Sequence, residues 1–233
     1  MKTAIITGAS CGIGAAIAQR FIADGFRVIN VSRRPNSDSQ VENLACDLLN
    51  EAQVQSAIGK CLDILSSSES TCLVHNATIL NKDRADDCDS ALLEEVLRVS
   101  VIAVNRLNQE LLPHMQPGSS VIYIGSTLSE KAVPGAFSYV VSKHAQLGMM
   151  RATCQDLSGR DVHTACICPG FTDTKMLREH LQHDEETLRA VAAMNSFGRL
   201  VEPGEIADLV SWVHNNPVIN GSVLHANLGQ LQS

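Results

Sequence analysis

The chain has 233 residues, of which 45% are hydrophobic, and this size and composition suit one α/β domain with a large buried core. Its formal net charge of −7 argues against nucleic acid or an anionic membrane surface as a partner, and its 3% of aromatic residues leave few platforms for stacking bases. Apolar runs are too short to span a bilayer, so we expect neither a membrane segment nor a secretory leader.

Short apolar runs rich in β-branched residues alternate with stretches of helical periodicity along most of the chain. Strands are predicted at 3–7, 27–32, 44–48, 71–77, 119–126, 161–168 and 221–227. Helices are predicted at 13–23, 51–65, 88–113, 138–157 and 202–216. This alternation with short connections predicts a doubly wound, Rossmann-type parallel sheet with helices on both faces, as a single domain over 1–233.

A glycine-rich turn, TGASCGIG at residues 7–14, follows the first predicted strand. Its glycines let the backbone turn tightly and approach a pyrophosphate at the N-terminus of the next helix. The alternative is a tight strand-to-helix connection without a ligand, which the position at the first turn of an alternating sheet disfavours. We assign to the nucleotide the loop residues Gly8, Ser10, Cys11, Gly12, Ile13 and Gly14.

The second and third predicted strands end in residues that can select the cofactor. Arg33 and Arg34 stand where an NAD-preferring site carries a carboxylate, and two guanidiniums can bind the 2′-phosphate of NADP(H). The alternative is that both arginines are ordinary solvated loop charges. Asp47, with Leu48, is assigned to the adenine end of the cofactor, and an aspartate at this place equally suits a turn.

Ser126, Tyr139 and Lys143 form the most informative group of residues in the chain. Tyr139 and Lys143 are four residues apart in a predicted helix, so their side chains share one face. A cation beside a phenol favours the phenolate and brings Tyr139 towards acid–base chemistry near neutral pH. Ser126, at the end of a predicted strand, can hold the oxygen that exchanges the proton. Alone, the tyrosine would be interpreted as a packing residue and the lysine as a solvated charge.

With HNAT at 75–78 and PGFTDT at 169–174, these motifs follow an order that resembles the short-chain dehydrogenases/reductases over essentially the whole chain. The resemblance implies that Ser126 positions and polarises the substrate oxygen, and that Tyr139 is the general acid or base. Lys143 would assist the tyrosine and hold the nicotinamide ribose, so both helix residues also contact the cofactor. The resemblance further assigns to the cofactor Asn76, Ala77, Pro169, Gly170, Phe171, Thr172 and Thr174.

The chain departs from the family pattern at three places. His75 and Thr78 flank the Asn-Ala pair, and HANLG at 225–229 replaces the usual ending at the edge of the substrate pocket. Ser100 stands where the family commonly has an asparagine that supports a proton-relaying water, and we include it in the catalytic set. Either Ser100 serves the relay, or a water substitutes, or turnover is slower.

Eight cysteines are scattered along the chain without the spacing of a zinc site. Cys166 and Cys168 alternate along a predicted strand, and neighbours at this spacing are poorly placed to form a disulfide. We therefore expect reduced cysteines, no metal site and a cytoplasmic protein.

These motifs predict an NADPH-dependent oxidoreductase that reduces a ketone or aldehyde to an alcohol, or catalyses the reverse reaction. Residues 1–125 would form its nucleotide-binding part and 126–233 its catalytic and substrate part. The alternatives are an NAD-dependent alcohol dehydrogenase, and a catalytically weak NADP-binding regulatory protein on the same fold.

The substrate pocket is expected to be apolar and to lie under a lid at 175–197. Its predicted lining is Thr127, Leu128, Pro134, Phe137 and Phe171, a set that suits ketones, diketones, 3-oxoacyl groups and steroid-like carbonyls alike. In relatives the two long helices build a dimer face, so we expect a homodimer or homotetramer. The alternative is that the apolar stripes of these helices pack entirely against the chain's own sheet.

Overall fold

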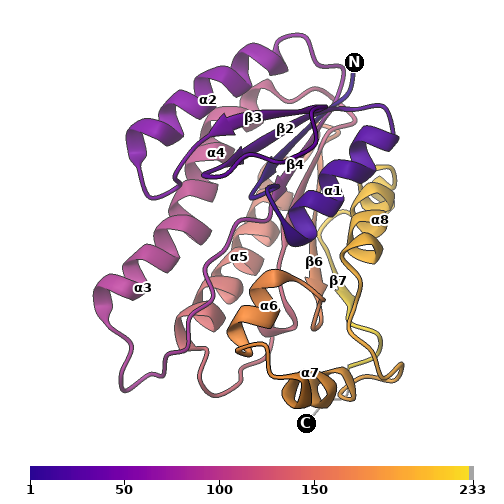
Figure 1. The fold of residues 1–233 in the computed structure, drawn as a ribbon. Coiled ribbons are helices and arrows are strands. Elements are labelled where there is room, and N and C mark those ends of the chain that lie inside the picture. Colours follow the sequence, from indigo (N-terminus) through magenta and orange to yellow (C-terminus); the bar gives the residue numbers. More distant parts are fainter. Residues whose placement is uncertain (231–233) are drawn as a thin grey trace.

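The computed structural model describes residues 1–230, which form one sheet of seven parallel strands (Figure 1). The strands lie in the order β3-β2-β1-β4-β5-β6-β7. Their bounds are β1 Thr3–Thr7, β2 Arg27–Ser32, β3 Val41–Ala45, β4 Thr71–His75, β5 Ser120–Ile124, β6 His163–Pro169 and β7 Ser222–Ala226. The predicted doubly wound parallel sheet in a single domain is confirmed.

The three central strands, β1, β4 and β5, are buried along their whole length. Their sequences TAIIT, TCLVH and SVIYI are mostly apolar because a parallel sheet covered on both faces needs apolar side chains on both. The edge strand β3 is exposed at three of its five residues. The predicted apolar core therefore lies around the centre of the sheet.

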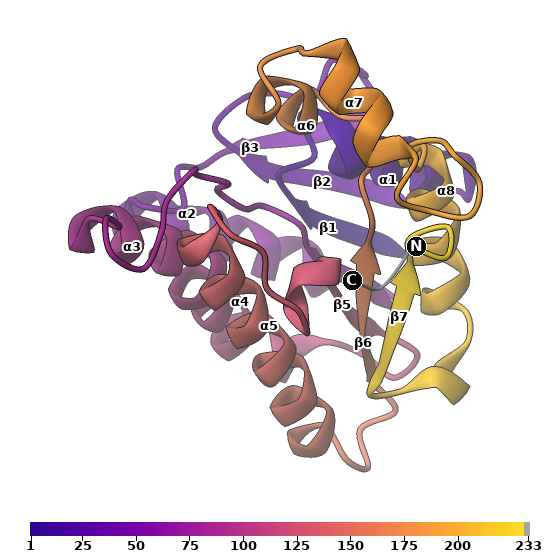
Figure 2. The same cartoon turned by 90° about the horizontal axis from the view of Figure 1, so that it is seen from below.

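Helices cover both faces of the sheet, as Figures 1 and 2 show. The α-helices are α1 Gly12–Ala23, α2 Glu51–Leu65, α3 Ser90–Leu97, α4 Ala103–Leu111, α5 Phe137–Asp156, α6 Lys175–His180, α7 Glu185–Ala192 and α8 Pro203–His214. On one face α1 and α8 bury apolar side chains such as Phe21 and Val210. On the other face α2, α4 and α5 bury Ile58, Leu107 and Met150.

Helices α1 and α8 pack against each other although they lie near opposite ends of the chain (Figure 1). Arg20 of α1 pairs with Asp208 of α8, 188 positions away. Ser211 of α8 donates a hydrogen bond to Asp24 at the end of α1, at 2.6 Å. The apolar face of each helix is thus buried partly by the other.

Residues 88–113, predicted as one helix, are divided in the structure. After α3 the chain forms a π-helical turn, η1 Arg98–Ile102, in which the amide of Ala103 donates to the carbonyl of Arg98. It then continues as α4 and ends in a short 3-10 turn around Pro113. The wider π turn places Ser100 in the protein interior at its centre.

The third strand lies three residues earlier than predicted. Pairing with β2 starts at Val41, opposite Val28, so the strand ends at Ala45. The amide of Cys46 still donates to the carbonyl of Ser32, at 3.1 Å, but Asp47 then turns the chain away. Of the sequence LACDL, only the first two residues therefore belong to the strand, and the other three lead into the turn that follows it.

No helix within residues 1–230 is both long enough and apolar enough to cross a bilayer. All eight cysteines belong to this part of the chain, and each is a free thiol. Cys166 and Cys168 lie on the same face of β6 with their Sγ atoms 3.8 Å apart.

The functional residues predicted from the sequence follow the carboxyl ends of the strands. The order of the strands reverses between β1 and β4, and in open α/β sheets ligands bind in the crevice at such a point. The glycine turn follows β1, Asn76 follows β4, Ser126 follows β5 and residues 170–174 follow β6. The fold therefore gathers these four segments at one edge of the sheet.

Candidate active site

The glycine turn between β1 and α1 has a backbone that other residues could not adopt easily. Gly8 and Gly12 have φ values of +74° and +58°, a region that favours glycine. A Cβ added to Gly14 would lie 2.4 Å from the carbonyl oxygen of Gly8 and 2.6 Å from Nδ2 of Asn76. No side chain caps the N-terminus of α1 at Cys11, so its first amides face the crevice as an anion site requires.

Two asparagines that the sequence analysis missed hold this turn in place. Asn30, in the buried centre of β2, accepts a hydrogen bond from the amide of Ala9 at 3.0 Å. Asn36 donates to the carbonyl of Ala9 at 2.7 Å. The sequence did contain a signal for Asn30, which stands within the apolar strand RVINVS, because a buried polar side chain needs a hydrogen-bond partner.

Asn76 ties the end of β4 to the same turn. Its side-chain Nδ2 donates to the carbonyls of Thr7 and Gly8, at 3.0 and 3.1 Å. The amides of Asn76 and Ala77 both donate to Oγ1 of Thr7. Besides lying beside the predicted cofactor site, this pair therefore fixes the shape of the glycine turn.

The two arginines after β2 are exposed, and Arg34 lies against the glycine turn. Nη2 of Arg34 lies 3.5 Å from Sγ of Cys11, and the carbonyl of Arg34 accepts from Oγ of Ser32 at 2.6 Å. Arg33 is exposed beside it. Cationic side chains at the mouth of an uncapped helix N-terminus fit a cofactor that carries a phosphate on its adenosine ribose.

Asp47 serves the turn after β3. One of its carboxylate oxygens accepts from the amide of Leu49 at 3.0 Å, and its own amide donates to the side chain of Gln53. Leu48 packs against the hydrophobic core. One carboxylate oxygen of Asp47 thus has the predicted role in the turn. Contact between Asp47 and the adenine stays a prediction.

His75, which departs from the family pattern, belongs to a buried polar chain. Its Nε2 lies 2.8 Å from Oδ1 of Asn108, whose Nδ2 donates to the hydroxyl of Tyr123 at 2.8 Å. Burial lowers the pKa of His75 to about 4, so the ring is neutral at physiological pH. His75 therefore links the end of β4 to α4 through Asn108 and is uncharged at physiological pH.

Ser126 and Tyr139 meet between the end of β5 and the first turn of α5. Oγ of Ser126 accepts from the amide of Leu128 at 3.1 Å, which orients the hydroxyl at the start of a short 3-10 turn. Burial raises the pKa of Tyr139 to about 12, and a hydrogen bond with Ser126 acts in the opposite direction. Both side chains are only partly buried, so a substrate oxygen can reach them.

Lys143 lies on the same side of α5, with Nζ 5.5 Å from the centre of the Tyr139 ring. It is 1% exposed and donates to the carbonyl of Ile124 at 2.8 Å and to Oε1 of Gln146 at 3.0 Å. Burial lowers its pKa to about 8. The expected phenolate is not the form favoured in this state, because the ammonium bonds to these two oxygens and burial of the phenol dominates.

Ser100 is fully buried in the π-helical turn, and its hydroxyl has no hydrogen-bond partner within residues 1–230. Its carbonyl oxygen accepts from Nε2 of Gln146 at 3.0 Å. Asn105, five residues further on, is exposed. Ser100, which stands where the family commonly has the relay asparagine, is thus connected to Lys143 through Gln146. The sequence analysis did not single out Gln146.

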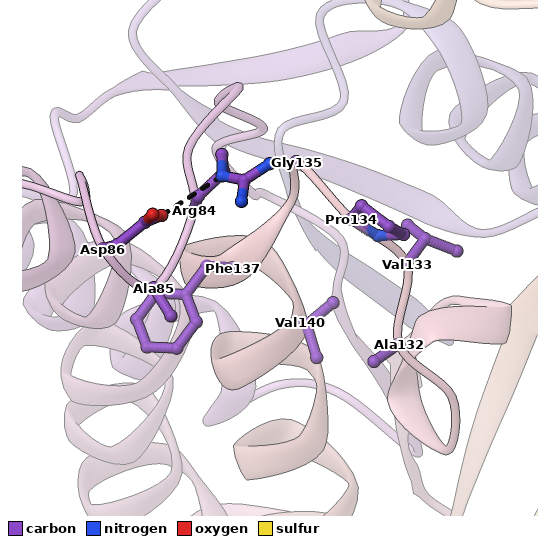
Figure 3. Close-up of a pocket in the computed structure, with 9 residues that line it drawn as sticks. All are labelled: Arg84, Ala85, Asp86, Ala132, Val133, Pro134, Gly135, Phe137 and Val140. Atoms are coloured by element: carbon purple, nitrogen blue, oxygen red, sulfur yellow. Dashed lines mark hydrogen bonds and ion pairs between the residues drawn. The ribbon is translucent and has the colours of Figure 1, made fainter.

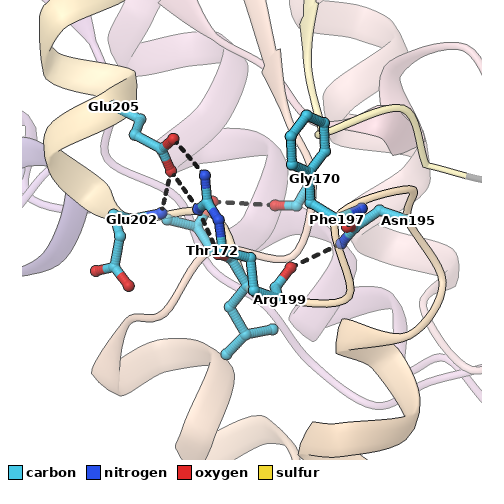
Figure 4. Close-up of polar contacts among 8 residues, drawn as sticks. Gly170, Thr172, Asn195, Phe197, Arg199, Glu202 and Glu205 are labelled. Carbon is cyan, nitrogen blue, oxygen red and sulfur yellow. Dashed lines mark hydrogen bonds and ion pairs between the residues drawn. The ribbon is translucent and has the colours of Figure 1, made fainter.

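The segment after β6 is held by its own polar contacts (Figure 4). The hydroxyl of Thr172 donates to the carbonyl of Gly170 at 3.0 Å, and that of Thr174 accepts from the amide of Leu177 at the start of α6. A Cβ on Gly170 would lie 2.9 Å from that of Asn227, so HANLG packs directly against this segment. Pro169 is buried and Phe171 partly so.

The predicted lid consists of α6, α7 and the loop that follows them. Met176 is 43% exposed, while Leu177 and Leu181 are partly buried. Its base is fixed by two ion pairs: Arg178 with Asp173, and Arg199 with Glu205 at 2.7 Å (Figure 4). Closure of this segment over a substrate stays a prediction.

An apolar pocket of about 410 Å³ lies at the start of α5 (Figure 3). It includes Pro134 and Phe137 of the predicted substrate lining, but Thr127, Leu128 and Phe171 do not line it. Its lining residues are Arg84, Ala85, Asp86, Ala132, Val133, Pro134, Gly135, Phe137 and Val140. Arg84 and Asp86 form an ion pair at its edge.

This fold and site define a known class of oxidoreductases. A family described as enoyl-(acyl carrier protein) reductase matches residues 8–230, and the chain belongs to the short-chain dehydrogenase/reductase family, whose members use nicotinamide cofactors. The chain is 28% identical to 2-(R)-hydroxypropyl-CoM dehydrogenase of Xanthobacter autotrophicus over 243 residues, 96% of each chain.

Two further proteins show the same similarity. The chain is 26% identical to 3-oxoacyl-(acyl-carrier-protein) reductase FabG of Escherichia coli over 240 residues, covering 98% of this chain and 96% of the relative. A blue fluorescent protein from a metagenomic library, solved in complex with NADPH, has a TM-score of 0.87 and 27% identity. That comparison covers 98% of this chain and 97% of the other.

Proposed function

We propose that this chain is an NADPH-dependent reductase that converts a ketone or aldehyde to an alcohol, with the reverse reaction open to it. The observation that carries the proposal is that Ser126 lies close enough to Tyr139 to affect its pKa, beside the buried ammonium of Lys143, at the edge where the glycine turn lies. A protein that only sensed the nucleotide would have no need of this arrangement.

The protonation of Tyr139 favours the reductive direction. With a pKa of about 12, the phenol carries its proton at neutral pH and can donate it to an oxygen that becomes an alkoxide. Ser126 would hold the same oxygen, and the charge on Lys143 would stabilise the tyrosinate left after donation. Bound NADPH supplies the hydride, while the chain orients the substrate and delivers the proton.

The preference for NADPH rests on the arginines and is supported by one similar protein. Arg34 lies against the glycine turn and Arg33 is exposed beside it, at the end of β2, where no carboxylate follows the strand directly. The similar blue fluorescent protein was solved with NADPH, and FabG is a 3-oxoacyl reductase by name. A 3-oxoacyl group or another small ketone is the substrate class that we propose.

An NAD-dependent alcohol dehydrogenase is the second candidate. Its support is the 28% identity to 2-(R)-hydroxypropyl-CoM dehydrogenase, which by name acts in the oxidative direction. We further propose a homodimer or homotetramer in the cytoplasm, with small molecules as its other partners.

Titration of the purified protein with NADPH and NADH, followed by nicotinamide fluorescence, tests the cofactor. We expect NADPH to bind at least about tenfold more tightly, because two guanidiniums can pair with the 2′-phosphate. Arg33→Ala should remove most of this preference, whereas Arg189→Ala, an exposed arginine on α7, should leave it unchanged. Equal affinities in the wild type would favour the NAD-dependent alternative.

Tyr139→Phe distinguishes an enzyme from a nucleotide-binding regulator. Loss of the proton donor should lower kcat by about 10²–10⁴, with NADPH affinity within about threefold of the wild type. The measurement is NADPH oxidation with a panel of ketones and 3-oxoacyl thioesters. Turnover in the wild type that survives this change would show that another group donates the proton.

A further inference from the structure

Gln146 is a completely buried amide that joins the catalytic lysine to the π-helical turn. It is 0% exposed, and it lies one helical turn after Lys143 on the same face of α5. Its Oε1 accepts from Nζ of Lys143 at 3.0 Å, and its Nε2 donates to the carbonyl of Ser100 at 3.0 Å. The three residues are each no more than 1% exposed.

Burial of such an amide is costly unless its polar atoms are paired. An amide buried without hydrogen-bond partners destabilises the folded chain, and an apolar side chain would fill the same space without that cost. Here both ends of the amide are paired, and one partner is an ammonium, which makes the stronger type of hydrogen bond. The side chain therefore contributes geometry that an apolar residue at this position could not supply.

The amide also determines which N–H donors of the ammonium remain free for other partners. An ammonium has three donors, and two of them go to the carbonyl of Ile124 and to Gln146. One donor remains for the crevice, on the side of Tyr139. Because Nε2 of Gln146 is fixed by the carbonyl of Ser100, its Oε1 must face Lys143.

We infer that Gln146 is a positioning residue for the proposed reaction, which holds the ammonium of Lys143 through a direct side-chain bridge to the backbone of Ser100. The inference rests on the proposed function for its catalytic meaning. In this chain the amide connects the lysine directly to the turn. The hydroxyl of Ser100 takes no part in it.

The groups that face Lys143 set the conditions of the test. On α5 these are Tyr139 and Gln146, and on β6 they are the thiols of Cys166 and Cys168, which raise the pKa of the lysine against the effect of burial. Among these side chains, within residues 1–230, Gln146 alone accepts a hydrogen bond from Nζ. Removal of that acceptor disfavours the charged ammonium, so the pKa of Lys143 must fall.

The titration of Lys143 can be measured without any cofactor or substrate. The chain has six lysines, so protein with ¹³C-labelled lysine gives few Cε signals, and Lys143→Arg identifies the one of interest. We expect Gln146→Met, which keeps the shape, to lower the pKa of Lys143 by at least about 0.5 unit. Gln146→Glu, which keeps an acceptor, should leave it at or above the wild-type value.

A matched control lies on the same helix. Gln155 is exposed near the end of α5, and Gln155→Met should leave the pKa of Lys143 unchanged. An unchanged pKa in folded Gln146→Met protein would overturn the inference, as would a fall in Gln146→Glu as large as that in Gln146→Met. If Gln146→Met does not fold, the sign of the shift in Gln146→Glu decides, because a fall contradicts the bridge.

Turnover then separates the inference from the proposed function. We expect kcat to fall about tenfold in Gln146→Met and to recover in part in Gln146→Glu. Wild-type protein without turnover on any carbonyl would refute the proposed reductase and leave the pKa result standing. A shifted pKa together with unchanged kcat in an active enzyme would overturn the positioning role.

Discussion

Tyr139 and Lys143 titrate in an order that has consequences for the reaction. Burial raises the pKa of the phenol to about 12 and lowers that of the ammonium to about 8, so the lysine loses its proton first as the pH rises. Near pH 7 both groups are protonated. This is the state in which a phenol can donate a proton while a neighbouring cation stabilises the anion that remains.

The alkaline limb of the pH profile should therefore belong to Lys143. We expect kcat/KM for NADPH, which reports the free enzyme, to fall above pH about 8 by up to tenfold per pH unit. Lys143→Arg should move this limb above pH 10 at a lower absolute rate, because the guanidinium keeps its charge. A wild-type profile that stays flat from pH 8 to 10 would contradict this assignment.

The same shift affects stability, with a definite sign. The pKa of Lys143 is about 8 in the folded chain and 10.5 ordinarily, so between these values the unfolded chain binds more protons. The contribution of this lysine to the free energy of unfolding therefore rises with pH across that window. Below pH 8 the folded state carries the full cost of a buried charge.

Residues whose roles depend on contacts distant in sequence could not be identified from the sequence. The proximity of Ser126, Tyr139 and Lys143 was predictable, because their order and spacing carry chemical meaning. Gln146 was not, because a glutamine in a helix normally faces solvent and its partner Ser100 lies 46 positions away. Asp47 shows the opposite case, in which a local turn role was one of two predicted interpretations and was observed for one oxygen.

At the level of the elements, the turn between β1 and α1 has the tightest backbone of the site. The carbonyl of Gly8 and the side chain of Asn76 leave no room for a Cβ on Gly14. Neither neighbour can move freely, since one is backbone and the other is bonded to two carbonyls.

Gly14→Ala should therefore damage both the fold and the cofactor site. We expect the free energy of unfolding to fall by about 1–3 kcal/mol from overpacking, with at least about tenfold weaker NADPH binding. Gly59→Ala is the matched control, because that glycine lies exposed in the middle of α2 with nothing within 4 Å of an added Cβ. It should stabilise the chain by about 0.5–1 kcal/mol.

Urea unfolding and nicotinamide fluorescence measure these two effects in parallel. Similar behaviour of the two variants would mean that the turn relaxes more easily than its contacts indicate. The elements themselves were largely predictable, because period-2 and period-3.6 patterns specify strands and helices. The π-helical turn was not, since RVSVI carries no proline, glycine or other sign of a changed helical pitch.

For the whole molecule, one exposed apolar side chain bears on the proposed assembly. Ile102, at the end of the π-helical turn, is 55% exposed on the outer side of the segment between α3 and α4. A large exposed apolar side chain at this place supports the proposed homo-oligomer. If the chain were a monomer, the apolar residues of this segment would all be expected to pack against its own sheet.

Light scattering at micromolar concentration should give two or four times the 25.1 kDa of one chain. Ile102→Glu should shift this mass towards that of a single chain without a change in the circular dichroism spectrum. Glu110→Gln, on the same helical stretch, serves as a charge-changing control that keeps the mass of the wild type. A single-chain mass for the unmodified protein would rule the oligomer out.

The packing of α1 on α8 has a consequence for biosynthesis. While the chain grows on a ribosome, the part of the apolar face of α1 around Phe21 that α8 covers stays exposed until residues 203–214 have been made. The nucleotide-binding part must therefore remain incompletely folded through most of translation, with apolar surface open to chaperones. A premature stop before Pro203 should yield an aggregating fragment and no shorter working enzyme.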